Sequence, residues 1–218
     1  MIKKKITSII LALGSMLCVQ AHHTDVLSNR DDQKEVNTQK TPVTISFTMN
    51  AKGGSQGTSY FQIMLSKDFK GEATARNINR ADWIDITDRF TLPKLETGDE
   101  EKSIFSKVNG DISNLLTPGQ AYTIAFRQIV KDQTAHGGQS QIRIRNFQLA
   151  KDSDNARTVV LDHASAEWSL FTKGKLRPNR PNISSSQIVL RGNHGKAIDY
   201  LQAETEVWVI AKPQIWTK

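Results

Sequence analysis

The sequence predicts an all-β fold, either a sandwich or a barrel, from three observations. First, several segments alternate apolar and polar residues with the two-residue period of a half-buried strand, as Val43, Ile45, Phe47 and Met49 do. Second, Gly, Pro, Asn and Asp residues separate these segments. Third, no window of about a dozen residues sustains helical spacing, so fewer than about a tenth of residues 43–218 are expected in helices. Many short strands separated by such turn residues are typical of sandwiches and barrels.

The N-terminal residues have the features of a secretory signal peptide. Three consecutive lysines precede an apolar run over residues 6–19 that is too short to span a bilayer. We favour cleavage after Ala21. The alternative is lipidation at Cys18, although the large Leu17 stands where a lipoprotein signal has a small residue. Either route exports the protein, as a secreted, periplasmic or outer-membrane surface protein, and it is membrane-bound only if Cys18 is lipidated.

Residues 22–41 are polar, without apolar periodicity, and predict a disordered leader between a signal peptide at 1–21 and a folded domain at 42–218. His22 and His23 stand side by side in this leader. Because no third ligand follows at a fixed spacing, we expect both to be solvated rather than bound to a metal.

Charge and cysteine content exclude several classes of function. A single cysteine rules out an internal disulfide and any site built from several cysteines. Removing the signal deletes three lysines and no acid, which lowers the formal net charge from +7 to +4. The densest basic residues, Lys173, Lys175, Arg177 and Arg180, are interleaved with glycine and proline, so they predict a solvated loop. No nucleic-acid partner is expected, because phosphate binding needs a clustered basic stripe.

The expected strands follow one another from Pro42 to the C-terminus. The longest, 121–130, is expected to pair with 141–149 after a break at Gly137 and Gly138. Short helical turns are expected only at 77–81 and 110–116. The predicted strands are 43–49, 61–65, 83–86, 121–130, 141–149, 157–161, 167–171, 187–191 and 207–212.

Residues 53–57, Gly-Gly-Ser-Gln-Gly, match the G-x-S-x-G pattern of serine nucleophiles. That pattern positions its serine only at a turn from a strand into a helix. Here residues 58–66 alternate as a strand, so we interpret these glycines as hairpin residues.

Acidic residues do not form a catalytic or metal-binding pattern. Asp82 and Asp85 are expected to face opposite sides of a strand, and residues 99–101 to form a solvated loop tip. Residues 152–155 begin like a calcium loop but lack its glycine and its distal glutamate. We therefore expect no catalytic residue, no metal and no cofactor, and we expect a protein that is not an enzyme.

The aromatic residues divide into two groups by their neighbours. Those on apolar strand faces are predicted to be core residues: Trp83, Tyr122, Phe126, Phe147 and Trp208.

Three further rings lie beside polar or loop sequence and are candidates for a ligand site: Trp168, Tyr200 and Trp216. The alternative is that each packs over the end of the sandwich as a lid.

Five short sequence motifs border the predicted strands: LSKDFKG at 65–71, ADWIDITDR at 81–89, YTIAFR at 122–127, IRIRNF at 142–147 and VWVIAKP at 207–213. With these motifs the chain resembles a family of secreted Bacteroidetes envelope proteins of unknown function, built on a choice-of-anchor-J-like jelly roll and found near SusC/SusD-type glycan uptake systems. Two positions depart from the family pattern: Ile142 replaces a usual tryptophan, and Glu206 stands where aspartate is common.

The resemblance implies a jelly-roll-like β-sandwich. It also implies a non-catalytic binding module that assists glycan capture, with carbohydrate as the ligand of Trp168, Tyr200 and Trp216 and with outer-membrane uptake proteins as partners. The alternative is a structural or adhesive envelope protein that binds other proteins through a sheet edge or face. Two coplanar exposed tryptophan rings would favour the glycan, and four buried tryptophans would favour the structural role.

Overall fold

The computed structural model describes residues 41–54, 59–95, 104–153, 156–174, 180–191, 198 and 201–217. The chain divides into two compact units, Met1–Thr38 and Gln39–Lys218, and all described residues belong to the second. The predicted signal peptide, Cys18, most of the leader and Tyr200 lie outside the described residues.

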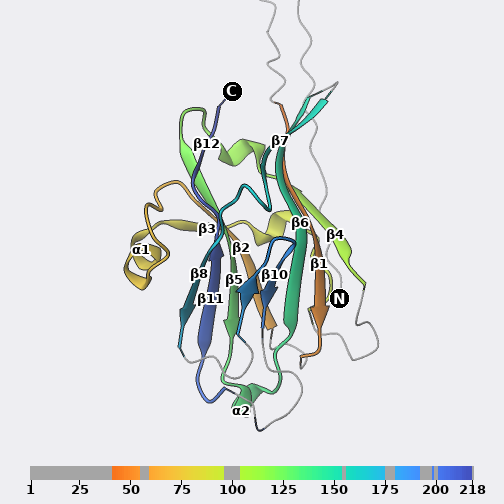
Figure 1. The fold of residues 1–218 in the computed structure, drawn as a ribbon, viewed down its shortest axis with the longest axis vertical. Coiled ribbons are helices and arrows are strands. Elements are labelled where there is room, and N and C mark those ends of the chain that lie inside the picture. Colours follow the sequence, from red (N-terminus) through yellow and green to blue (C-terminus); the bar gives the residue numbers. More distant parts are fainter. Residues whose placement is uncertain are drawn as a thin grey trace, which may run out of the picture. The chain divides into compact units, whose positions relative to one another are not determined.

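The second unit is a β-sandwich of two antiparallel sheets (Figure 1). Strands account for 51% and helices for 11% of the structure, which confirms the all-β prediction with slightly more helix than expected.

The first sheet is built around β1 and β6, which alternate inward apolar and outward polar side chains. On β1, Val43, Ile45, Phe47 and Met49 are buried, as their spacing predicted. Its strands in spatial order are β4 (Ser106–Asp111), β1 (Val43–Lys52), β6 (Gln141–Ser153), β10 (Gln187–Leu190) and β9 (Asn182–Ile183), with β7 (Ala156–Asp162) also paired to β6.

The second sheet is built around β5, which pairs with β2 on one side over residues 123–130 and with β11 and β12 on the other. Its strands in spatial order are β3 (Trp83–Asp85), β2 (Ser59–Ser66), β5 (Ala121–Val130), β11 (Thr205–Ile210) and β8 (Ser169–Lys173), with β12 (Gln214–Ile215) beside β5.

The expected pairing of 121–130 with 141–149 is wrong, because β5 and β6 belong to different sheets. Between them lies α2 (Gln133–His136), whose N-cap Asp132 accepts hydrogen bonds from the Thr134 and Ala135 amides. The helix ends at Gly137, at a φ of 82° that favours glycine. This capped turn leads the chain from one sheet to the other instead of back along the same sheet.

The hairpin interpretation of the glycines at 53–57 is also wrong. β1 and β2, which flank this segment, lie in different sheets and do not pair with each other. Gly53 and Gly54 have φ values of 72° and 92°, so the left-handed backbone that glycine permits occurs where the chain leaves the first sheet.

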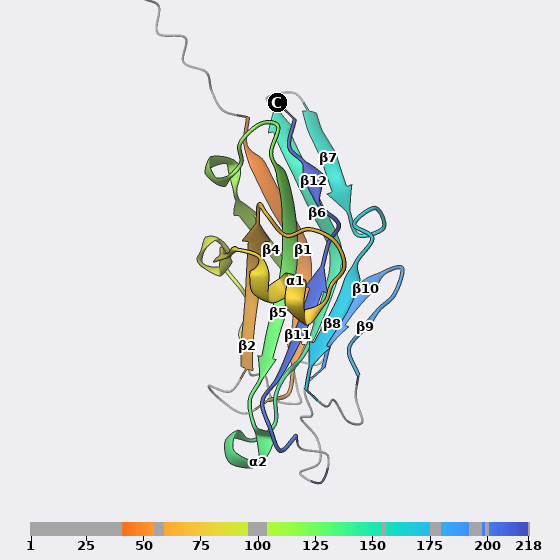
Figure 2. The same ribbon diagram turned by 90° about the vertical axis from the view of Figure 1, so that its left-hand side faces the viewer.

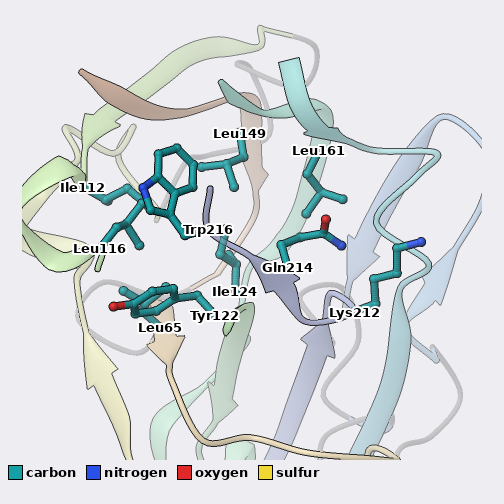
Figure 3. Close-up of a pocket in the computed structure, with 10 residues that line it drawn as sticks. All are labelled: Leu65, Ile112, Leu116, Tyr122, Ile124, Leu149, Leu161, Lys212, Gln214 and Trp216. Atoms are coloured by element: carbon teal, nitrogen blue, oxygen red, sulfur yellow. The ribbon is translucent and has the colours of Figure 1, made fainter. Parts of the chain in front are cut away.

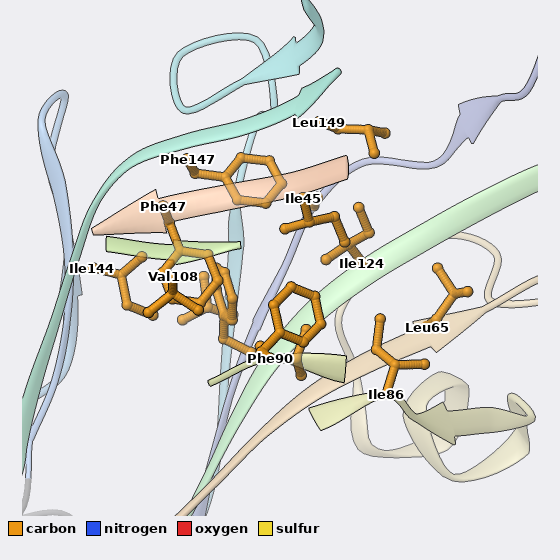
Figure 4. Packing of buried hydrophobic residues seen from close by; sticks show 14 of the residues in the cluster. Ile45, Phe47, Leu65, Ile86, Phe90, Val108, Ile124, Ile144, Phe147 and Leu149 are labelled. Carbon is orange, nitrogen blue, oxygen red and sulfur yellow. The ribbon is translucent and has the colours of Figure 1, made fainter. Parts of the chain in front are cut away.

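The main core lies between the sheets and is rich in phenylalanine (Figure 4). Phe126 is fully buried there, with its ring centroid 5.3 Å from that of Phe47 and 5.9 Å from that of Phe147. The core prediction is therefore confirmed for Phe126 and Phe147. Tyr122 is only half-buried at the edge of this core.

A second, smaller cluster of buried residues lies on the outer face of the second sheet. Here α1 (Ala75–Arg80) covers part of β5 and β11, as Figure 2 shows. Its N-cap Thr74 accepts a hydrogen bond from the Asn77 amide, and Ile78 is its buried residue. The cluster includes Trp208, which is buried as predicted but on this outer face, and packs against Trp83, which is only half-buried.

Two single turns of 3₁₀ helix complete the described elements, η1 (Thr87–Arg89) and η3 (Ser113–Leu115). The second falls within the predicted turn at 110–116, and α1 overlaps the predicted turn at 77–81.

Candidate functional site

Trp168, the first predicted ligand residue, packs onto the main core. Its ring centroid lies 5.6 Å from that of Phe126 and 4.9 Å from that of Phe147, and its Nε1 donates to the His163 carbonyl. The side chain is half-buried. One ring face of Trp168 therefore contacts protein, while carbohydrate binding by this residue stays a prediction.

Trp216 closes one end of the sandwich (Figure 3). Only 8% of the residue is exposed, so the free ring face expected for a ligand platform is not present, and the lid alternative describes its position. The Lys151 ammonium lies 4.5 Å from its ring centroid. The apolar cavity beside the ring has a volume of about 10 Å³, which is enough for one water molecule at most.

A much larger hollow lies on the outer face of the second sheet, between α1 and β8. It is an open groove of about 600 Å³, within the range of small-molecule sites in proteins. The groove is lined by Met64, Ala75, Ile78, Asn79, Ala81, Asp82, Trp83, Arg127, Phe171, Lys173, Glu206 and Trp208.

Strand register explains why these distant residues meet. Gln62, Arg127, Trp208 and Phe171 are successive partners across β2, β5, β11 and β8, so all four side chains project from the same outer face. The row places a guanidinium next to an indole: the Arg127 Cζ lies 5.2 Å from the centroid of the Trp208 ring.

A chain of hydrogen bonds crosses the groove floor and fixes its polar groups. Glu206 Oε1 accepts from Arg127 Nε at 2.6 Å and from Trp208 Nε1 at 2.7 Å. Arg127 Nη1 donates to Gln62 Oε1 at 2.8 Å, and Gln62 Nε2 donates to Asp85 Oδ2 at 2.6 Å. Because each group is held by its neighbours, Arg127 and Glu206 are oriented before any ligand arrives.

Asp85, at the far end of this chain, has a pKa below its usual 3.8. Burial raises the pKa, but this effect is outweighed by hydrogen bonds from the Thr87 hydroxyl and amide, by the Gln62 amide and by the charge of Arg127. The ionised carboxylate is therefore the form that the folded chain stabilises.

The lowered pKa of Asp85 predicts that the stability of the protein depends on pH. The stabilisation by ionised Asp85 is fully present above the unfolded-state pKa and is lost as the pH falls through the lower folded-state pKa. We expect Asp85→Asn to destabilise the protein at pH 6, and the difference from wild type to shrink as the pH falls below about 4. Urea unfolding at several pH values measures this, with Asp88→Asn as the control for charge removal. A difference that does not change with pH would contradict it.

Trp83 forms the wall of the groove on the α1 side. Its Nε1 donates to the Ile78 carbonyl at 3.1 Å, and its ring centroid lies 5.0 Å from that of Trp208. The two rings are inclined by 47°. Two tryptophans are thus half-buried, Trp83 and Trp168, and two are buried, Trp208 and Trp216. Neither coplanar exposed rings nor four buried ones are found.

The rim of the groove carries polar side chains of both signs. Asn79, Asp82 and Lys173 are exposed. None of these three side chains forms a hydrogen bond or an ion pair with any residue in the described ranges. They are therefore available to a ligand.

Sequence reasoning did not identify this groove. It assigned Trp83 and Trp208 to the core and gave Arg127 no role. One feature of the sequence could have pointed to it: Trp83, Arg127 and Trp208 lie in three of the five motifs of the family resemblance, at 81–89, 122–127 and 207–213. Residues from these motifs line one groove only in the folded protein, where β5 pairs with β11.

In the described part of the chain, no group of three or more His, Cys, Asp or Glu side chains could hold a metal ion. Asp152, from the calcium-like segment, instead pairs with Arg157 at 2.6 Å and accepts from the Thr44 hydroxyl. No helix within the described ranges is long and apolar enough to cross a membrane.

One family model matches the chain. Its description is "Domain of unknown function (DUF5017)", and it covers residues 31–168. The matched region includes α1, Trp83 and Arg127, and it ends before β8 and β11. No curated protein and no solved structure matches the chain.

Proposed function

The chain belongs to the DUF5017 family of domains of unknown function, and we propose that it is a non-catalytic binding module that holds a carbohydrate in the groove between α1 and β8. This site lies on the outer face of the second sheet, and its lining includes neither Trp168 nor Trp216.

The observation that carries this proposal is the combination of an aromatic floor and a polar rim in one groove. Sugar rings have an apolar face of C–H groups and an edge of hydroxyls. Trp83 and Phe171 offer partly exposed ring surface. Asn79, Asp82 and Lys173 offer both donors and acceptors to the hydroxyls.

The groove supports binding more than catalysis. Its two inner charged groups, Arg127 and Glu206, are bonded to each other at 2.6 Å. A general acid or base needs a group with a free and tuned proton position, whereas this pair fixes the shape of the floor. We therefore propose that this protein is not an enzyme.

We also propose that the protein is exported from the cytoplasm. The lysine-rich start and the apolar run at 6–19 support secretion or surface location, and a glycan-binding domain there would encounter polysaccharides outside the cell. Partnership with outer-membrane uptake proteins rests on the family resemblance alone.

The proposal is tested by blocking the groove. Residues 22–218 are applied to a glycan array, together with an Asn79→Trp variant that places a large ring in the groove from α1. The matched control is Arg76→Trp, which adds the same ring to the same helix at an exposed position outside the groove lining.

We expect the wild type and Arg76→Trp to bind the same glycans and Asn79→Trp to lose them, with melting temperatures that remain equal within about two degrees. Equal binding by all three proteins would place the ligand elsewhere. Absence of any glycan binding by the wild type would refute the proposal and favour the structural or adhesive role.

A further inference from the structure

We infer that the groove selects a neutral saccharide, and that two adjacent hydroxyls of the sugar bridge Glu206 on β11 and Lys173 on β8. This inference rests on the proposed function, because it names the ligand class and the contacts of the same groove.

The charges of the groove favour a neutral ligand. Its lining contains two cations, Arg127 and Lys173, and two anions, Asp82 and Glu206. Arg127 is already neutralised by Glu206 at 2.6 Å. The lining therefore offers an acidic sugar no net positive charge, and the sugar's carboxylate would lie near Asp82 or Glu206, where like charges repel.

Glu206 is held in one orientation. Its Oε1 accepts from both Arg127 Nε and Trp208 Nε1, and 17% of its side chain remains exposed. A carboxylate fixed in this way loses little further freedom when a hydroxyl donates to it, which lowers the entropic cost of binding.

Lys173 is the direct neighbour of Glu206 across the sheet. The two residues are register partners on β8 and β11, and both line the groove, so their Cβ atoms lie about 5 Å apart. They form no ion pair with each other, because the Glu206 carboxylate is turned toward Arg127. A hydroxyl can donate to Glu206 while its neighbour on the sugar ring accepts from Lys173.

An apolar surface lies beside this donor and acceptor. Phe171 is two residues before Lys173 on β8 and is the register partner of Trp208, so its ring projects from the same face. A sugar whose hydroxyls reach Glu206 and Lys173 would place its C–H face against Phe171.

The experiment compares two panels of six-sugar ligands by isothermal titration calorimetry. The neutral panel contains glucose, mannose, galactose and xylose oligomers, and the acidic panel contains oligogalacturonate and a heparin fragment. Each titration is repeated at low and high sodium chloride, because binding between net charges weakens with salt and binding through hydroxyls does not.

We expect at least one neutral oligomer to bind, with an affinity that changes less than about twofold with salt. Binding of acidic oligomers alone, or a fall of about tenfold or more with salt, would overturn the inference and leave the proposed function standing. If no oligomer of either panel binds, the proposed function fails as well.

Two variants test the named contacts on the neutral oligomer that binds. Lys173→Ala removes a side chain without a protein partner among the described residues, so its folding should be unaffected, and we expect about a tenfold or greater loss of affinity. Glu206→Gln should weaken binding similarly. The control is Lys107→Ala, at an exposed position on β4 of the other sheet. Unchanged affinity in Lys173→Ala would refute the bridging contact.

Discussion

Replacement of Trp208 by alanine is expected to lower the free energy of unfolding by about 3–5 kcal/mol, as truncation of a buried tryptophan does. The residue is only 4% exposed, and its ring lies 5.0 Å from that of Trp83 and 5.2 Å from the Arg127 guanidinium. The variant also removes the indole donor to Glu206. Because Trp208 is the centre of the cluster on the outer face of the second sheet, both the stability of the protein and the shape of the groove depend on it.

Thermal and urea unfolding measure this effect, and a conservative variant separates its two causes. Trp208→Phe keeps a ring in the cluster but not the donor to Glu206, so we expect it to lose less than half as much stability as Trp208→Ala. If Trp208→Ala melts within about two degrees of the wild type, this position for Trp208 is wrong.

Phe126→Ala is the second large effect that we expect, again about 3–5 kcal/mol, for loss of a ring from the main core. Phe126 is fully buried, and its ring contacts three other phenylalanines and Trp168. The surrounding side chains come from both sheets, so they cannot close the cavity without moving strands.

Urea unfolding also measures this variant, with Phe126→Leu as its partner because leucine refills part of the space. We expect Phe126→Leu to lose clearly less than Phe126→Ala. Equal losses in both variants would mean that the ring contacts, and not the filled volume, determine stability at this position.

Periodicity predicted the strands that have one apolar face. Segments such as 121–130 and 43–49 contain enough inward apolar residues for the two-residue period to be visible, and β5 has the predicted bounds. β4 was missed because its inward residues are Val108 and Gly110, and glycine adds no apolar signal. β9 and β12 have two residues each, too few for any period.

The assignment of strands to sheets could not be predicted from periodicity. Alternation tells which side chains face the core, but both sheets of a sandwich face the same core. The expected pairing of 121–130 with 141–149 failed for this reason, since β5 and β6 contribute Phe126 and Phe147 to one core from opposite sides.

The groove was harder to predict than the fold because its residues are on the outward faces of strands. Trp208 sits in an apolar run, and from sequence alone nothing distinguishes a ring buried between sheets from one buried under α1. Arg127 and Glu206 are 79 positions apart, and their ion pair depends on the register of β5 with β11. The terminal position of Trp216 made it a ligand candidate, yet its side chain is buried in the main core.

The most direct test of the groove as the ligand site uses the indole N–H groups of the four tryptophans. Their signals in a ¹H–¹⁵N spectrum, assigned by Trp→Phe variants, are followed while a neutral oligosaccharide that binds is titrated into the protein of residues 22–218. Trp83 and Trp208 line the groove, whereas Trp168 and Trp216 pack against the main core. We predict that the Trp83 and Trp208 signals shift with the ligand and the other two do not. Shifts confined to Trp168 and Trp216 would contradict the account and return the site to these two rings.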